Sequence, residues 1–262
     1  MFSAIAFLQE QRVLAEKWTS PRPARERLLY VGIDDTDMPG APGTNKLARA
    51  IVAELAGQYA CRVVVRHQLL DDPRVPCTSK NSAAALLFEP KNGSAMGPLA
   101  DRLRGLLRER SAPGSDPGLC VAERVPASVA AFGVRCQRAL VAQREARRLG
   151  DRCGLLLEGL GGSEDGVIGA LAAVGLAAGG NDGRVVQIGG WPDDLAGPQD
   201  IETLAQRGVE VRCHETGGPV ESGTVDVGKH LRPNYRGHRV VLFVRPAAER
   251  GAAAQWQAVR LL

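Results

Sequence analysis

An apolar run that ends in three aspartates constrains the fold of this chain more than any other feature. Residues 28–33 are apolar and suit a buried β-strand, and Asp34, Asp35 and Asp37 follow directly. Ligands of α/β folds bind where strands end and helices begin. Carboxylates this close together repel each other unless a positive charge lies nearby. We therefore expect the strand to deliver an acidic turn to a binding site.

The acidic turn, residues 32–37, admits two interpretations. Mg²⁺ is usually held by one or two carboxylates together with the phosphates of a substrate, so Asp34, Asp35 and Asp37 are candidate Mg²⁺ ligands beside a nucleotide. The alternative is that Asp35 and Asp37 only form turns and cap the following segment.

Thr44 follows the acidic turn at the start of a predicted helix, residues 45–56. It is either the N-cap of that helix or part of a phosphate site, since helix N-termini attract anions and Lys46 is nearby. The loop is not a Walker A motif, because Lys46 does not follow a glycine and no Ser or Thr comes after it.

The rest of the chain alternates helix-like and strand-like segments without a repeat, which predicts α/β or α+β layers. Residues 112–118 have the composition of a linker, and an N-terminal helix is expected at 3–18. Further helices are expected at 45–56, 98–110, 125–148 (with Gly133 as an interruption), 167–177 and 201–207, and strands at 62–68, 83–88, 184–188, 209–213 and 240–244.

Composition restricts the function further. The net charge of +4 is compatible with phosphate-bearing partners but does not demand nucleic acid, and aromatics at 4% argue against base stacking as the main binding mode. The six cysteines include no C-x-x-C pair, so structural zinc is not expected. No apolar run reaches the length of a membrane span, and no signal peptide is evident, so we expect reduced thiols in a cytoplasmic protein.

Three segments in order resemble one known family. The acidic turn, the loop at 40–46 and the helix after it resemble the kinase-like domain of archaeal tRNA(Ile) 2-agmatinylcytidine synthetase, which uses ATP to activate an anticodon cytidine and attach agmatine. Residues 75–83 and 166–175, with a later Asp182, are similar to two further stretches of that family. The similarity runs from about residue 30 to about residue 246, which is most of the chain.

The resemblance implies an α+β protein in which a kinase-like α/β domain packs with a ferredoxin-like α+β domain. Residues 28–112 would be the kinase-like region and 119–246 the ferredoxin-like region. An N-terminal helical extension at 1–27 and a C-terminal tail at 247–262 would flank them.

The resemblance also assigns roles. Thr44 would take phosphate from ATP, Asp34, Asp35 and Asp37 would bind metal and phosphate, and Lys80 would bridge phosphates. Asp182 is a further candidate metal ligand. For residues 78–81 a plain polar turn remains an alternative, and for the small-residue helix at 167–177 close packing on a sheet does. The candidates for binding the nucleotide are Thr36, Gly43, Asn45, Lys46, Thr78, Asn81, Gly166 and Gly169.

Two features depart from the family. We expect no counterpart of its OB-fold and zinc ribbon, and Gly43 and Asn45 replace a Cys and a second Thr. We therefore expect tRNA recognition to be missing or supplied by a partner subunit. The basic cluster at 229–239 is either an RNA or phosphate contact or a surface loop, and His67 is expected to be structural.

The sequence thus predicts an ATP- and Mg²⁺-dependent phosphoryl-transfer or ligase-type enzyme, with a tRNA cytidine or a small molecule as acceptor. The alternative is a non-catalytic nucleotide-binding sensor or assembly subunit.

Overall fold

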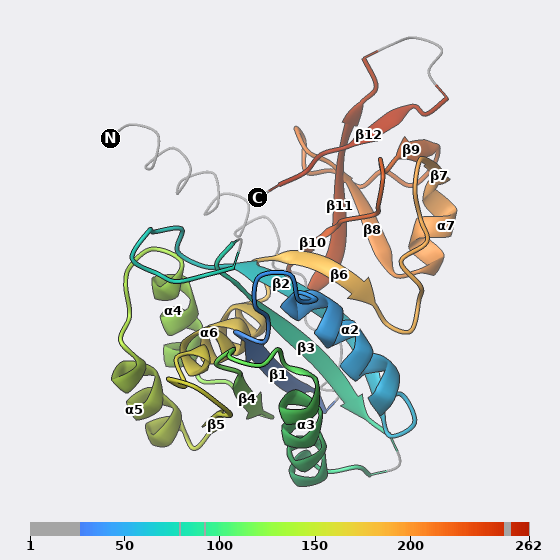
Figure 1. The fold of residues 1–262 in the computed structure, drawn as a ribbon. Coiled ribbons are helices and arrows are strands. Elements are labelled where there is room, and N and C mark those ends of the chain that lie inside the picture. The colour runs from blue at the N-terminus through green and yellow to red at the C-terminus, as the bar shows by residue number, and fades with distance from the viewer. Residues whose placement is uncertain (1–26, 79, 92, 249–252, 262) are drawn as a thin grey trace. The chain divides into compact units, whose positions relative to one another are not determined.

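A computed structural model describes residues 27–78, 80–91, 93–248 and 253–261. These residues fall into two compact α+β units, one within Glu26–Pro192 and one within Asp193–Leu261 (Figure 1). The helix expected at 3–18 and the N-terminal extension lie outside the described residues. No helix in the described part of the chain is long and apolar enough to cross a membrane.

The larger unit is built on a sheet in which every strand is antiparallel to its neighbours. β1 lies in the interior of this sheet, so the acidic turn at its end is delivered from the core of the unit. The strands lie in the order β5 (Leu156–Gly159), β4 (Gly118–Ala122), β1 (Leu29–Asp34), β3 (Ser82–Pro90), β2 (Tyr59–Gln68) and β6 (Arg184–Ile188).

Helices cover both faces of this sheet (Figure 1). Alternate residues of β1, such as Val31 and Ile33, share a core with α2 (Thr44–Leu55) and α3 (Met96–Arg110). This core forms because side chains alternate between the faces of a strand. On the other face lies α6 (Gly166–Gly179), which packs on β1 and β4. α4 (Ala127–Cys136) and α5 (Gln143–Cys153) pack in turn against α6.

Close contact between α6 and the sheet depends on glycine. A Cβ added at Gly32 of β1 would overlap the carbonyl oxygen of Ala170, and one added at Gly118 of β4 would overlap the backbone of Gly166. The backbone of α6 therefore lies directly on β1 and β4. The predicted small-residue helix at 167–177 is confirmed, and close packing on a sheet accounts for its composition.

The smaller unit is built around β11 (Arg239–Pro246). β11 pairs in parallel with β8 (Val209–Cys213) and antiparallel with β10 (Asn234–Arg236) and β12 (Trp256–Ala258). β12 continues through β9 (Thr224–Asp226) to β7 (Pro198–Asp200), and α7 (Ile201–Gln206) packs on β8.

The expected strands are confirmed in place, with bounds that differ by a few residues. The prediction that 125–148 is mostly helical is confirmed, but the interruption lies at 137–142, between α4 and α5, and not at Gly133. Gly133 does not interrupt α4. A Cβ there would lie 2.7 Å from the carbonyl oxygen of Ala172, so the glycine lets α4 approach α6.

The contacts place the division between the units at residues 192–193. The predicted linker at 112–118 lies inside the larger unit, where β4 begins at Gly118 and pairs with β1. β4 was not predicted, and its pairing gives the chain on both sides of 112–118 one shared core. Whether the predicted regions are kinase-like and ferredoxin-like stays a prediction.

Gly32→Ala should lower the free energy of unfolding by roughly 1–3 kcal/mol, because overpacking a tight interface forces backbone shifts. Gly105→Ala is the matched control. Gly105 is exposed inside α3, and a Cβ added there would meet open space, so alanine should stabilise by about 0.5–1 kcal/mol. Urea unfolding checks both, and equal effects at the two sites would contradict the packing of α6 on β1.

Candidate active site

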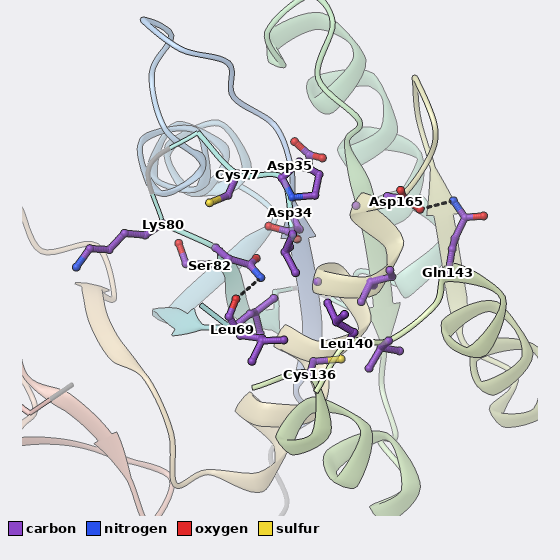
Figure 2. A pocket seen from close by; sticks show the side chains of 18 of the residues that line it. Asp34, Asp35, Leu69, Cys77, Lys80, Ser82, Cys136, Leu140, Gln143 and Asp165 are labelled. Atoms are coloured by element: carbon purple, nitrogen blue, oxygen red, sulfur yellow. Dashed lines mark hydrogen bonds between the residues drawn. The ribbon is translucent and has the colours of Figure 1, made fainter. Parts of the chain in front are cut away.

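A cavity of about 330 Å³ opens at the carboxyl end of β1 (Figure 2). Its walls come from the end of β1, the start of α2, the start of α6 and the segments 69–82 and 136–143. The predicted site residues in its lining are Asp34, Asp35, Asp37, Thr44, Thr78, Lys80, Asn81, Gly166 and Gly169.

The acidic turn forms one wall of this cavity. Burial raises the pKa of Asp34 to about 7, and the charges of Asp35 and Asp37 add to the increase. Burial also raises the pKa of Asp35, as do the charges of Asp116, Asp37 and Asp165. Asp35 adopts the left-handed region, with φ 51°, which is uncommon for a residue other than glycine. The turn therefore concentrates negative charge at the cavity.

These carboxylates fit Mg²⁺ by the chemistry of their donors. They are oxygen ligands that form no ion pair with the described residues, and Mg²⁺ commonly takes one or two carboxylates and completes its shell with water and phosphate oxygens. Among the described residues, no three His, Cys, Asp or Glu side chains converge on a single metal position.

A chain of hydroxyl groups joins the acidic turn to α2. Thr36 donates to the hydroxyl of Thr44 over 3.0 Å, and Thr44 donates to Oδ1 of Asp37 over 3.0 Å. Thr78 donates to Oδ2 of the same carboxylate over 2.9 Å. Thr44 is not the N-cap of α2, because Gly43 occupies that position. Its hydroxyl instead bonds to a carboxylate in the cavity wall.

The start of α6 forms an adjoining wall. A Cβ at Gly169 would overlap Oδ2 of Asp34, so glycine is needed for the helix to lie against this carboxylate. Asp165, at the N-cap of α6, accepts a hydrogen bond over 3.1 Å from Nε2 of Gln143, drawn in Figure 2. Close packing therefore explains Gly169, and Gly166 contacts β4 in the same way.

Three residues of the polar segment at 78–81 take different positions at the cavity. Asn81 donates to the carbonyl oxygen of Leu70 over 2.9 Å, which fixes the wall of the cavity. Lys80 lines the cavity, but in Figure 2 its side chain extends away from Asp34 and Asp35. Thr78 bonds to the acidic turn through Asp37.

Five predicted site residues do not line the cavity. Thr36 is 2% exposed and lies behind Thr44, while Gly43, Asn45 and Lys46 belong to the start of α2. Asp182 lies elsewhere: its Oδ2 is 2.7 Å from Nδ1 of His67, and Gln137 donates to its Oδ1 over 3.1 Å.

Sequence reasoning missed Asp116, Asp165 and the wall at 136–143. Asp116 lies in the segment expected to be a linker, and Asp165 directly precedes the predicted site residue Gly166. Since long-range packing brings both to Asp35, no local pattern in the sequence marks them.

Comparisons with known proteins bear on the fold. No family model and no curated protein sequence matches this chain. Among solved structures, a complex of TiaS with an isoleucine tRNA and ATP matches with a TM-score of 0.51 and 24% identity over 57% of this chain. A tRNA fluorescent labelling enzyme matches with a TM-score of 0.50 and 24% identity over 56% of this chain. A complex of TiaS with the same tRNA, AMPCPP and agmatine matches with a TM-score of 0.50 and 23% identity over 56% of this chain.

This chain spans 36% of the length of each of these three proteins. At this identity the likeness shows a shared α+β fold, in agreement with the expected fold class.

The raised pKa of Asp34 predicts a pH dependence of stability. The folded protein retains this proton up to about pH 7, whereas the unfolded chain releases it near pH 3.8, so the free energy of unfolding should fall as pH rises between these values. Asp34→Asn, which cannot ionise, should be more stable than the parent at pH 8, and the difference should shrink towards pH 4.

Urea titrations in metal-free buffer with a chelator measure this difference. The burial of charge at Asp34 would be contradicted if the variant were less stable than the parent at pH 8. It would also be contradicted if the difference in free energy of unfolding between variant and parent were the same at pH 8 and pH 4.

Proposed function

We propose that the cavity binds ATP with Mg²⁺ and that the protein is an ATP-dependent enzyme whose Thr44 accepts the γ-phosphate. The observation that carries this proposal is the hydrogen bond from the Thr44 hydroxyl to Asp37 at the cavity wall. A hydroxyl is a weak nucleophile unless a base can take its proton, and Asp37 is within reach to do so.

In the transfer step, Oγ1 of Thr44 attacks the γ-phosphorus. The bond from that phosphorus to the β–γ bridging oxygen breaks, and ADP leaves with that electron pair. The proton of Thr44 passes to Asp37. Thr36 and Thr78 hold the threonine and the carboxylate in place through their own hydrogen bonds. Positioning of this kind is a major part of phosphoryl-transfer catalysis.

Asp34 and Asp35 are the residues proposed to hold Mg²⁺. When bound, the ion neutralises charge on the phosphates. Without a cation, the carboxylates of the cavity wall would repel an anionic nucleotide. The N-terminus of α6 faces the same cavity and adds a partial positive charge.

The final acceptor we propose is a tRNA nucleotide, so that the protein is an ATP-dependent tRNA-modifying enzyme. Two lines support it: the motifs that resemble the agmatinylcytidine synthetase family, and the fold shared with TiaS, which has been crystallised with an isoleucine tRNA and ATP. A cytidine is the first base to test, and a small molecule is the competing acceptor. A partner subunit that supplies RNA recognition and a cytoplasmic location stay predictions.

Incubation with γ-labelled ATP and Mg²⁺ should place label on the protein, and peptide mass spectrometry should locate it at Thr44. Thr44→Val should abolish the label, and Thr44→Ser should retain it. Asp37→Asn should slow labelling by roughly 10²–10⁴-fold, the usual contribution of a general base, while nucleotide binding persists.

Thr216→Val is the matched control, because Thr216 lies in an exposed turn of the smaller unit. Its labelling should equal that of the parent. Labelling that persists in Thr44→Val would place the acceptor elsewhere and overturn the role of Thr44.

The alternative function is a nucleotide-binding sensor or assembly subunit. Calorimetry separates the two, since a sensor would bind ATP with Mg²⁺ but form neither ADP nor phosphoprotein. The hydrogen bond between Thr44 and Asp37 favours the enzyme, because simple binding needs no base next to a buried hydroxyl.

A further inference from the structure

A group of basic side chains lies on the α2-facing side of the sheet, beside the cavity. Two partly buried arginines of the larger unit form ion pairs, Arg104 with Glu158 and Arg147 with Glu164. Arg66 and Arg184 form no ion pair with the described residues. We call them, together with Lys46, Arg49 and Lys80, the basic strip.

Two arginines of the strip are paired with each other on neighbouring strands of the sheet. Arg66 of β2 and Arg184 of β6 are direct register partners in an antiparallel pair. Like charges placed directly opposite destabilise a sheet. Burial lowers the pKa of Arg66, and the charge of Arg184 lowers it further. Neither arginine forms an ion pair with a carboxylate of the described residues, so within the described part of the chain this repulsion has no compensating carboxylate.

α2 adds further charge to the same face. Arg49 donates to the carbonyl oxygen of Val186 through Nε over 3.1 Å and Nη2 over 2.7 Å, which holds its guanidinium against β6. Val186 is two residues from Arg184, so these β6 residues share one face. Lys46 lies one helical turn before Arg49 and is exposed.

The strip is continuous with the cavity. Nη2 of Arg66 donates to Oε1 of Gln68 over 3.2 Å, and Nε2 of Gln68 donates to the carbonyl oxygen of Asn81 over 2.7 Å. Asn81 and Lys80 both line the cavity. Figure 2 shows the Lys80 side chain extending away from Asp34 and Asp35, so its ammonium group does not contact these two carboxylates.

We propose that the basic strip binds the sugar–phosphate backbone of an RNA whose target nucleotide enters the cavity. A single nucleotide has too few phosphates to meet charges spread over α2, β2 and β6. Successive phosphates of a nucleic-acid backbone can each contact one of these positive charges, and arginine suits bidentate phosphate contacts. Backbone contacts of this kind position a nucleic acid without reading its sequence. This inference rests on the proposed function, which places the nucleotide chemistry in the adjacent cavity.

The test measures binding of an unmodified tRNA transcript over a range of salt concentrations. Arg66→Gln combined with Arg184→Gln should weaken binding on the order of tenfold or more near physiological salt. The magnitude of the slope of log K against log salt should fall by roughly 1.4, because about 0.7 of a counterion is released for each of the two phosphates neutralised on a single strand. ATP affinity should be unchanged, and the melting temperature should be equal or higher, since the repulsion is removed.

Arg144→Gln combined with Arg148→Gln is the charge-matched control. Both arginines are exposed on α5, away from the strip, and the control removes the same net charge. Arg66→Lys with Arg184→Lys should keep most of the affinity and the salt slope. Unchanged tRNA binding in the Gln pair, or an equal loss in the α5 control, overturns the proposal.

The two proposals fail separately. If the parent protein does not bind ATP, the proposed function fails, whereas the RNA assay still reports on the strip. If ATP binds and Thr44 is labelled but the Gln pair binds tRNA like the parent, only the strip proposal fails.

Discussion

The contact between the backbone of α6 and strands β1 and β4 is the constraint on which the candidate site depends. Gly32 and Gly118 allow the helix to lie directly on the strands, and Gly169 allows it to lie against the carboxylate of Asp34. With a side chain at these positions the helix would stand further from the sheet. The N-terminus of α6 would then leave the acidic turn, and the cavity would lose one wall.

The same packing sets the electrostatics of the site. By burying Asp34 it raises the pKa of that carboxyl to about 7, and it gathers Asp116 and Asp165 near Asp35. The result is an acidic wall that needs a cation before it can accept phosphate. Two threonine hydroxyls donate to Asp37. In the proposed mechanism, charge neutralisation and proton acceptance therefore fall to different members of one short turn.

The sequence predicts those parts of the site that are close together in the chain. The acidic turn and Thr44 lie seven residues apart around one strand end, and the structure joins them through a hydrogen bond. Contacts that cross the fold could not be predicted. Asp182 bonds to His67 instead of lining the cavity, because the pairing of β6 with β2 brings these two residues together. Asp116 reaches the site only because β4 pairs with β1.

A crystal structure with a non-hydrolysable ATP analogue and Mg²⁺ tests the central claim most directly. We predict that the triphosphate lies in the cavity and that the metal ion is bound by Asp34 or Asp35. The γ-phosphorus should lie within about 3–3.5 Å of Oγ1 of Thr44, the distance of a near-attack arrangement. A nucleotide bound outside this cavity, or one whose γ-phosphate points away from Thr44, would contradict the proposed function.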